Sequence, residues 1–415
     1  MTYYIDTLGG SPKGDGKAPA SARSHCGDIP LSPGDSLLFR RGTVIRGSIK
    51  LSPGEPGRPI YYGAYGVGAP PKLMGSVNIG APERWERVKS GLWSYKGGIS
   101  SEAGSLIFDR GASAGTLRWK PDELCEPGDW YDSRLGSTKA KKTIAEPVFL
   151  LCSEDNPGKV YSSIECAVYG SHRIITPADW TVIEDLDFQN SGVHAIRGPA
   201  SHLVIRRCGF SYIGGCVWSA ERKIRLGNAI ELWNRADNIL IEDCRFDNIY
   251  DSCITHQGNS DCRSAESIAI RGCTFSNYGM AAYEGRDRMS RGLSFEGNLC
   301  CGAGLGFGAQ GDTVPRRSEI YPQPMGHHIF LWRIEAPVEN GGISIHNNDF
   351  FSAPRGAALY SLIAPEAERQ LSLRCNRYYT ASQMLIARYG NADFSPERFE
   401  EYCHRSGETG ERIEL

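Results

Sequence analysis

One short pattern recurs seven times between residues 183 and 378, and it constrains the fold more than any other feature of the chain. Most copies have an aliphatic residue, a cysteine or asparagine three positions later, and an aromatic residue two positions after that. The copies occupy residues 183–188, 205–210, 241–246, 270–275, 295–300, 345–350 and 373–378. Successive copies begin 22, 36, 29, 25, 50 and 28 residues apart. A fixed strand pattern at a loose period of this kind predicts a solenoid.

Each copy of the pattern represents one coil, which cannot bury its apolar face alone. Stacking of the coils makes a continuous core, and extra length between copies is expected to leave the rim as loops. The longest extra segments are residues 211–228 and 302–341. We therefore expect functional side chains near these two insertions.

The middle position of the pattern is cysteine in three copies and asparagine in the last three. These residues are Cys208, Cys244, Cys273, Asn298, Asn348 and Asn376. Cysteine behaves as a small buried hydrophobic group, and asparagine amides can stack between coils. We therefore expect a ladder of free thiols, with disulfides among the 14 cysteines as the alternative. Free thiols favour a reducing compartment.

The composition is that of a globular protein, with 40% hydrophobic and 23% charged residues. A formal net charge of −2 gives no reason to expect a nucleic acid or a membrane surface as partner. There is no apolar run of 18 residues, and no basic stretch followed by an apolar one opens the chain. These features predict a cytoplasmic protein if the sequence is complete, and a secreted or periplasmic one if a signal peptide was removed. They leave the oligomeric state open.

Three segments are expected along the chain. Residues 1–75 alternate strand-like runs with Pro/Gly turns and are interpreted as an N-terminal capping module. Residues 76–380 are assigned to the solenoid and its loop insertions. Residues 381–415 are interpreted as a C-terminal cap, in which Ser395 and Pro396 begin a short helix as N-cap and first helical residue. This helix is expected to cover the open last coil, because exposed strand edges promote aggregation.

A second strand follows the aromatic residue in each coil, as in VHAIRG, NAIELW and SCITHQ. Period-two alternation directs one isoleucine of each of these strands inward and the next residue outward. The outward residues form one predicted column of Arg197, Glu231 and Thr255, which Tyr283 is expected to continue. A polar column beside two long loops indicates a groove, which suits an extended polymer.

Several stretches of the chain resemble a known group of proteins. They read YYIDTLGG, LSPGDSLLFRRG, PIYYGAYGVGAPPKL, EPGDWYDS, IRLGNAIELW, NIYDSCITHQG and GLSFEGNLCCGAGLGFG. In these stretches the chain resembles polysaccharide lyases of the pectate-lyase-like superfamily, and among them the β-helix alginate lyases. The resemblance implies an all-β, right-handed parallel β-helix that cleaves an acidic, uronate-containing polysaccharide or oligosaccharide by β-elimination. The same superfamily also holds hydrolases, epimerases and non-enzymatic binders, so the fold alone does not fix the reaction.

A uronate lyase removes the proton on C5, beside the carboxylate, and expels the oxygen linked at C4. It needs a group that neutralises the carboxylate, a base for the C5 proton and an acid for the leaving oxygen. Lysine and arginine suit the first role, and a desolvated lysine, a histidine or a tyrosine near arginines suits the others. The candidate catalytic residues are therefore Lys223, Arg225, His194, His256 and Tyr283.

Polar and aromatic residues around these candidates are expected to bind the sugar chain. They are Arg197, Asn228, Glu231, Gln257, Glu284, Arg286, His327, His328, Trp332 and Arg333, and Arg316 and Arg317 are expected on the same wall of the cleft. Arginine holds carboxylates through paired hydrogen bonds, and tryptophan stacks on sugar rings. The alternative for the charged loop residues is an ordinary solvated surface.

No metal-binding motif is visible, so no cofactor is expected, although calcium serves as neutraliser in some relatives. The main alternative reaction is glycoside hydrolysis, for which Glu231, Asp251 and Glu284 offer the pair of carboxyl groups that it requires. A C5-epimerase and a non-catalytic carbohydrate-binding solenoid are the remaining alternatives.

Overall fold

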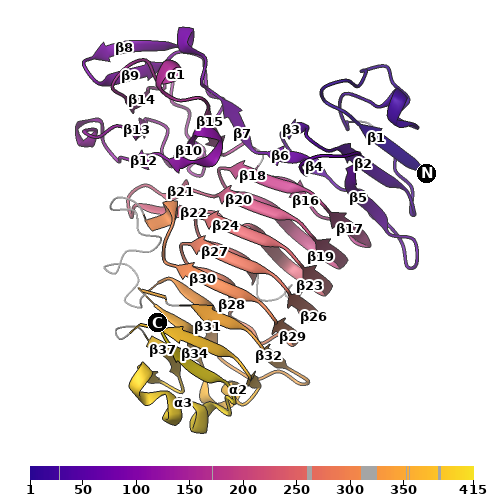
Figure 1. Cartoon of the computed structure of the whole chain (residues 1–415), viewed down its shortest axis with the longest axis vertical. Coiled ribbons are helices and arrows are strands. Elements are labelled where there is room, and N and C mark those ends of the chain that lie inside the picture. The colour runs from indigo at the N-terminus through magenta and orange to yellow at the C-terminus, as the bar shows by residue number, and fades with distance from the viewer. Residues whose placement is uncertain are drawn as a thin grey trace.

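The chain folds into a three-sided solenoid with a smaller β subdomain beside its N-terminal end (Figure 1). The structure is a computed structural model that describes residues 1–27, 29–170, 172–258, 264–309, 325–351, 353–354, 356–381 and 385–415. The expected right-handed parallel β-helix is confirmed. No helix in these ranges is both long and apolar enough to cross a membrane.

Strands of successive coils pair in parallel and form three faces. The first face contains β4 (Ile49–Lys50), β16 (Arg173–Thr176), the first parts of β19 (His194–Arg206) and β23 (Ile230–Glu242), β25 (Ser252–Gln257), β28 (Ala281–Arg286), β31 (His327–Ile334), β34 (Ala357–Ile363) and β37 (Leu385–Tyr389). The second contains β1 (Thr2–Ile5), β2 (Ser36–Arg40), β5 (Ile60–Tyr65), β17 (Thr181–Glu184), the later parts of β19 and β23, β26 (Ser264–Arg271), β29 (Arg291–Glu296), β32 (Gly342–His346) and β35 (Leu371–Arg374).

The third face completes each coil. It contains β3 (Val44–Arg46), β6 (Lys72–Met74), β18 (Asp187–Ser191), β20 (Gly209–Ile213), β24 (Arg245–Ile249), β27 (Thr274–Tyr278), β30 (Leu299–Ala303), β33 (Asp349–Phe351), β36 (Arg377–Thr380) and β39 (Glu411–Glu414). The repeated sequence pattern lies at the corner between the second and third faces. Its aromatic residues point inward and stack, with ring centroids 4.8 Å apart for Phe210 and Phe246 and for Phe246 and Phe275.

The predicted ladder at this corner is confirmed. The Cys244 thiol donates to the carbonyl of Ile205 one coil earlier, at 3.7 Å, and all cysteines within the described ranges are free. The asparagines continue the ladder, since the Asn348 side chain donates to the carbonyl of Phe295 and to Oδ1 of Asn376, both at 2.9 Å. The residue before each ladder position turns the chain sharply, with a left-handed φ of 52° at Arg207, for example.

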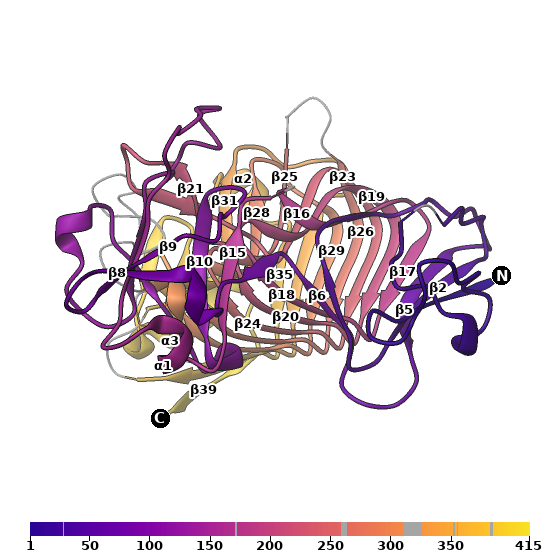
Figure 2. The same cartoon turned by 90° about the horizontal axis from the view of Figure 1, so that it is seen from above.

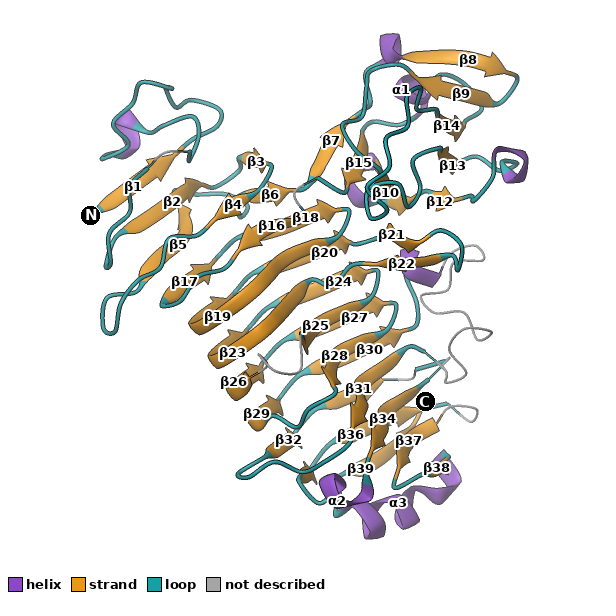
Figure 3. Ribbon diagram, turned by 180° about the vertical axis from the view of Figure 1, so that it is seen from behind, coloured by secondary structure: helices purple, strands orange, loops and turns teal. Residues whose placement is uncertain are grey.

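Residues 1–75, expected as the entry and capping strands, contribute strands to the stacked sheets. Their strands β1, β2 and β5 pair in parallel with one another and then with β17, so they are the first coils of the solenoid (Figure 3). The sequence pattern of the later coils is absent from them. Connections in this part include the short 3₁₀ turn η1 (Pro19–Ser21).

Residues 76–168 do not form coils, contrary to the expected 76–380 boundary. They form two mostly antiparallel sheets, which we call the inserted subdomain (Figure 2). One sheet has β7 (Ser76–Asn78), β10 (Ala103–Phe108), β11 (Ser113–Ala114) and β15 (Ile164–Val168). The other has β8 (Trp85–Lys89), β9 (Leu92–Tyr95), β12 (Thr116–Leu117), β13 (Asp129–Asp132) and β14 (Phe149–Cys152). A separate core that includes Trp130 and Phe149 holds the sheets together. The short helical segments are η2 (Pro82–Arg84), η3 (Asp109–Gly111), η4 (Pro121–Glu123) and α1 (Pro157–Val160).

The C-terminal segment closes the last coil, as expected. The chain makes a 3₁₀ turn, η7 (Pro396–Arg398), and then the helix α3 (Phe399–Ser406), whose buried Tyr402 packs on Tyr378 of β36. Ser395 precedes the turn, but its side chain makes no capping hydrogen bond. The other elements near this end are α2 (Pro365–Glu368) and β38 (Ala392–Phe394), which pairs antiparallel with β37.

The two insertions differ in how much of them is described. The 211–228 insertion forms an antiparallel hairpin of β21 (Cys216–Ser219) and β22 (Ile224–Leu226). The 302–341 insertion includes η6 (Phe307–Ala309), but residues 310–324 lie outside the described ranges. Only the first insertion is therefore described in full.

Candidate active site

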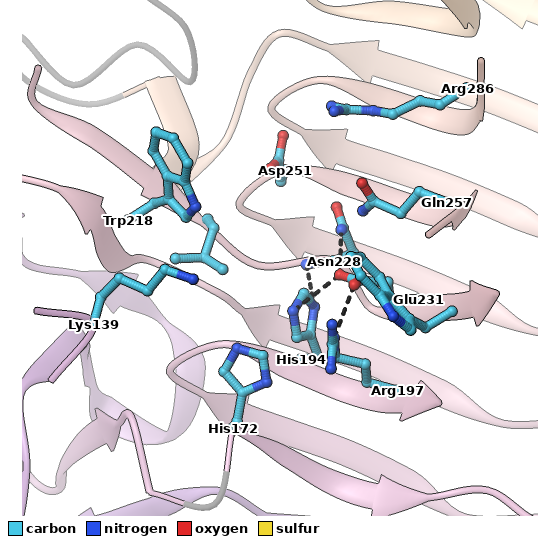
Figure 4. A pocket seen from close by; sticks show the side chains of 12 residues that line it. Lys139, His172, His194, Arg197, Trp218, Asn228, Glu231, Asp251, Gln257 and Arg286 are labelled. Carbon is cyan, nitrogen blue, oxygen red and sulfur yellow. Dashed lines mark hydrogen bonds and ion pairs between the residues drawn. The ribbon is translucent and has the colours of Figure 1, made fainter. Parts of the chain in front are cut away.

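A cavity of about 390 Å³ lies on the first face, where the inserted subdomain and the β21–β22 hairpin rise beside the stacked strands. Lys139 of the inserted subdomain and Trp218 of the hairpin point into it from one side (Figure 4). Gln257 and Arg286 of the solenoid face it from the other side. The strands supply its floor because alternate residues of β19, β23, β25 and β28 point outward.

Glu231 of β23 contacts three other polar side chains of this floor. Its Oε1 accepts from Nε of Arg197 at 2.8 Å, and its Oε2 lies 2.9 Å from Nε2 of His194 and 3.0 Å from Nδ2 of Asn228. The side chain is 4% exposed. Burial alone would raise the pKa of this carboxyl, but the contacts with His194 and Arg197 outweigh burial and hold the pKa well below its ordinary value. Glu231 therefore keeps its negative charge even in acid.

His194 is held in place by two partners. Its Nδ1 accepts the backbone N–H of Asn228 at 3.2 Å, so Nε2 carries a hydrogen and points to Glu231. His172 stands edge-on to His194 with ring centroids 5.0 Å apart. Burial, with the nearby His194 and Arg197, lowers the pKa of His172 to about 3, so the His172 ring is neutral near pH 7.

Two more carboxyl groups, those of Asp251 and Glu284, lie one and two coils further along. Asp251 borders the cavity just before β25, and the fully buried Glu284 of β28 accepts from Oγ of Ser252 at 2.8 Å and pairs with Arg286. Burial raises the pKa of Glu284 above its ordinary value; the charge of Arg286 opposes this rise, and the negative charge of Asp251 adds to it. The site thus holds carboxyl groups whose environments push their pKa values in opposite directions.

Aromatic rings complete the walls. The guanidinium of Arg197 lies 4.4 Å from the ring centroid of Trp233, which borders the cavity next to Gln257 in strand register. Trp218 is 44% exposed at the rim. Exposed tryptophan faces of this kind are typical of surfaces that stack on sugar rings.

Seven of the residues proposed from the sequence border this one cavity. They are His194, Arg197, Asn228, Glu231, Asp251, Gln257 and Arg286, and Glu284 lies directly behind Arg286. The outward column runs through Arg197, Glu231, Thr255 and Glu284, which are paired in register. Its last member is therefore Glu284 and not Tyr283, as the sequence had suggested.

Four of the five candidate catalytic residues lie elsewhere. Tyr283 is in register with Ile254 and Ile329 on the inner side of the strands and is 1% exposed. His256 lies in the inward row of Leu232, and its Nε2 is 3.3 Å from the carbonyl oxygen of Asn234. Both side chains are enclosed by the core, so a sugar in the groove cannot reach them.

The two cations proposed from the 211–228 insertion are also outside the cavity. Arg225 is buried, and its guanidinium donates to the carbonyls of Gly215 at 2.6 Å and Gly104 at 2.7 Å, which joins the hairpin to the inserted subdomain. The ammonium of Lys223 lies 6.0 Å from the ring centroid of Trp119. The contacts of Arg225 with backbone carbonyls and of Lys223 with Trp119 join segments that are far apart in the sequence, so the local sequence pattern could not predict them.

The residues proposed from the second insertion do not border the cavity. His327 is buried and stacks on Tyr360, with ring centroids 4.4 Å apart. His328 lies inside the solenoid, hydrogen-bonded to Tyr278 and to the carbonyl of Phe351, and burial lowers its pKa to about 4.

Trp332 is a half-buried neighbour of Arg286, with the guanidinium 4.9 Å from its ring centroid, and Arg333 is exposed. Arg316 and Arg317 lie outside the described residues.

Sequence reasoning missed Lys139, His172, Trp218 and Trp233 as members of the site. Trp233 follows Glu231 by two positions, so the period-two alternation already contained the signal for it. Lys139 and His172 had none, because they come from segments that are not part of the repeat. Among the described residues no three His, Cys, Asp or Glu side chains converge as a metal site would require. The expectation on cofactors stays a prediction.

Comparison with known proteins identifies the fold. No protein-family model and no curated protein sequence matches the chain. Among solved structures, the complex of XylC with xylose matches with a TM-score of 0.53 at 13% identity, over 92% of this chain and 62% of that one. A protein described as a glycoside hydrolase matches with a TM-score of 0.52 at 10% identity, over 93% of this chain and 94% of that one. Pectate lyase Pel9A matches with a TM-score of 0.42 at 10% identity, over 92% and 70% of the two chains.

The chain thus spans less than two thirds of the XylC chain that it matches. At such low identities the similarity is one of fold. The resemblance to parallel β-helix proteins that was expected from the sequence is confirmed at that level.

Proposed function

We propose that this protein is a glycoside hydrolase that cleaves its substrate in the first-face cavity. The observation that carries the proposal is a set of three acidic residues at one cavity: Glu231 and Asp251 border it, and Glu284 lies behind Arg286, with its pKa raised where that of Glu231 is lowered. Glycosidic bond cleavage needs one carboxyl that holds a proton and one that stays ionised.

The roles follow from these environments. Glu231, held as an anion by Arg197 and His194, either activates water or attacks the anomeric carbon directly. Burial and the nearby charge of Asp251 raise the pKa of Glu284, so Glu284 is the carboxyl group that holds a proton more readily. Asp251, which borders the cavity, passes this proton to the oxygen of the leaving sugar. His194 contacts Oε2 of Glu231 and keeps that carboxylate in place.

The pairing of the two arginines of the cavity also favours hydrolysis over the β-elimination that was expected from the sequence. Arg197 is paired with Glu231, and Arg286 is paired with Glu284. These arginines therefore do not offer the surplus positive charge that a lyase needs to neutralise a uronate. The names of the two similar structures with TM-scores above 0.5, a xylose complex and a glycoside hydrolase, agree with this proposal.

The test is an assay of hydrolysis on a panel of substrates. Release of nitrophenol measures cleavage of 4-nitrophenyl glycosides, and new reducing ends measure cleavage of neutral and acidic oligosaccharides. Glu231→Gln and Asp251→Asn should each lower kcat/KM by about 100-fold or more, the usual loss for a general acid or base. Glu242→Gln is the matched control, because Glu242 lies on the same strand but pairs with Arg271 away from the cavity. Full activity in both site variants would overturn the assignment.

A uronate-specific polysaccharide lyase remains the second candidate, and a specific observation favours it. His172 is neutral at any pH above about 3, and a neutral imidazole beside Lys139 has the lone pair and the cation that C5 proton abstraction requires. Elimination makes an unsaturated uronate that absorbs ultraviolet light, and hydrolysis does not. Rising absorbance on alginate, pectate or glucuronan, abolished by His172→Ala and kept by Glu231→Gln, would select the lyase.

A further inference from the structure

A second cavity of about 430 Å³ adjoins the catalytic one. Lys139 and Trp218 border both cavities and so form the partition between them. The outer cavity lies between the 133–144 loop of the inserted subdomain and the β21–β22 hairpin. A glycan that enters the inner cavity past this partition must lie across the outer one.

Hydrogen bonds to a buried glutamate hold the two walls of the outer cavity in place. Glu102 is fully buried, and its two carboxyl oxygens accept the backbone N–H of Val217 at 2.6 Å and of Gly136 at 2.9 Å. One side chain thus ties the hairpin that carries Trp218 to the loop that carries Lys139. The loop is closed further by a backbone hydrogen bond of 2.9 Å from Lys142 to Ser137.

The outer cavity shares Lys139 with the inner one and adds a second lysine, Lys142. Lys139 and Lys142 border it, and neither ammonium has a carboxylate partner in the part of the chain that the structure describes. Glu221 is the one acidic residue among the described side chains that border it. Each arginine of the inner cavity, in contrast, is balanced by a glutamate. Unbalanced cations beside an exposed tryptophan face fit a sugar ring that carries a negative charge.

We infer that the outer cavity is a second sugar subsite, which binds a carboxylated or sulfated sugar unit of the oligosaccharide cleaved in the inner cavity. Trp218 stacks on this unit, and Lys139 and Lys142 pair with its anionic group. The inference rests on the proposed function for the place of the cleaved bond. The binding of the charged unit itself does not depend on the reaction.

The binding test uses single sugars as probes, so that it is independent of cleavage. Glucose, glucuronate and glucose 6-sulfate are titrated into the wild-type protein and the Lys139→Ala/Lys142→Ala double variant by isothermal calorimetry and ligand-observed NMR. The anionic probes should bind more tightly than glucose, and the double variant should weaken them by about five-fold or more, the sum of two exposed ion pairs. Lys159→Ala, which changes an exposed lysine of the same subdomain on α1, should bind as the wild type does.

The two anionic probes distinguish the sources of charge. Preference for glucuronate assigns the subsite to uronates, and preference for the sulfate assigns it to sulfated sugars. Equal binding of neutral and anionic probes, or unchanged binding in the double variant, would overturn the inference. Hydrolysis of a short aryl glycoside depends on Glu231 and not on the charged unit. A protein that does not hydrolyse such a glycoside would therefore count against the proposed reaction and not against the subsite.

Discussion

Glu231 keeps its charge through a small set of contacts, and Arg197 is the one that can be removed with least disturbance. Arg197→Gln should raise the pKa of Glu231 by about one unit, because an opposite charge in contact lowers a carboxyl pKa by 1–3 units. Catalysis needs the ionised form, so the acid limb of the pH profile of kcat/KM should move to higher pH. Profiles of wild type and variant on one aryl glycoside measure this shift.

The same variant makes a prediction for stability. The folded-state pKa of Glu231 lies below its unfolded value, so its contribution is present above the unfolded pKa and is lost as pH falls through the folded one. Without Arg197 that loss should begin at higher pH. Arg235→Gln is the control, because Arg235 is on the same strand but pairs with Asp179 outside the cavity. An acid limb that stays in place would show that Arg197 does not set the charge of Glu231.

Single residues of the site were predicted from the sequence where their position follows from alternation along a strand. Arg197 and Glu231 were found because each lies one residue after an inward isoleucine. The prediction that Tyr283 continues the outward column was wrong. The order of inward and outward residues in its coil could be fixed only by pairing with the neighbouring coil. Burial decided the rest: the guanidinium of Arg225 is occupied by carbonyls that lie far away in the sequence.

At the scale of elements, the ladder makes each coil depend on the next. Asn348 is fully buried; its Oδ1 accepts the backbone N–H of Asn298 at 2.9 Å, and its Nδ2 donates to Phe295 and Asn376. Asn348→Ala leaves these groups buried without partners, and each such group costs about 1–3 kcal/mol. We expect the free energy of unfolding to fall by about 3 kcal/mol or more, as measured by urea denaturation.

An exposed asparagine provides the comparison. Asn78→Ala should change the unfolding midpoint by much less, because water can replace the bonds that its amide makes. If both variants lost the same stability, the ladder would be no more than ordinary packing. The ladder could be predicted from the sequence because the spacing of residues within each copy of the pattern is constant, although the copies themselves are unevenly spaced. The inserted subdomain could not, since its antiparallel strands repeat no pattern and pair across variable distances.

At the scale of the whole molecule, the open ends of the solenoid are the places where strand edges could pair with another chain and cause aggregation. The C-terminal end is closed in three ways: Glu408 accepts from Nδ2 of Asn376 at 2.7 Å, Tyr402 covers Tyr378, and β39 pairs with β36. The residues of β39 are Glu, Arg, Ile and Glu, so the last edge is charged. Charged edge strands oppose the addition of another chain.

Removal of residues 395–415 should therefore expose both the last ladder position and the uncharged part of the β36 edge. We expect a lower Tm and a shift to larger species by size-exclusion chromatography with light scattering, compared with the full chain at the same concentration. Tyr402→Ala, which opens a cavity over Tyr378 but keeps Glu408 and β39, should lower Tm without the shift in mass. A truncated protein with the mass and Tm of the full chain would mean that the last coil closes itself and that the cap serves another purpose.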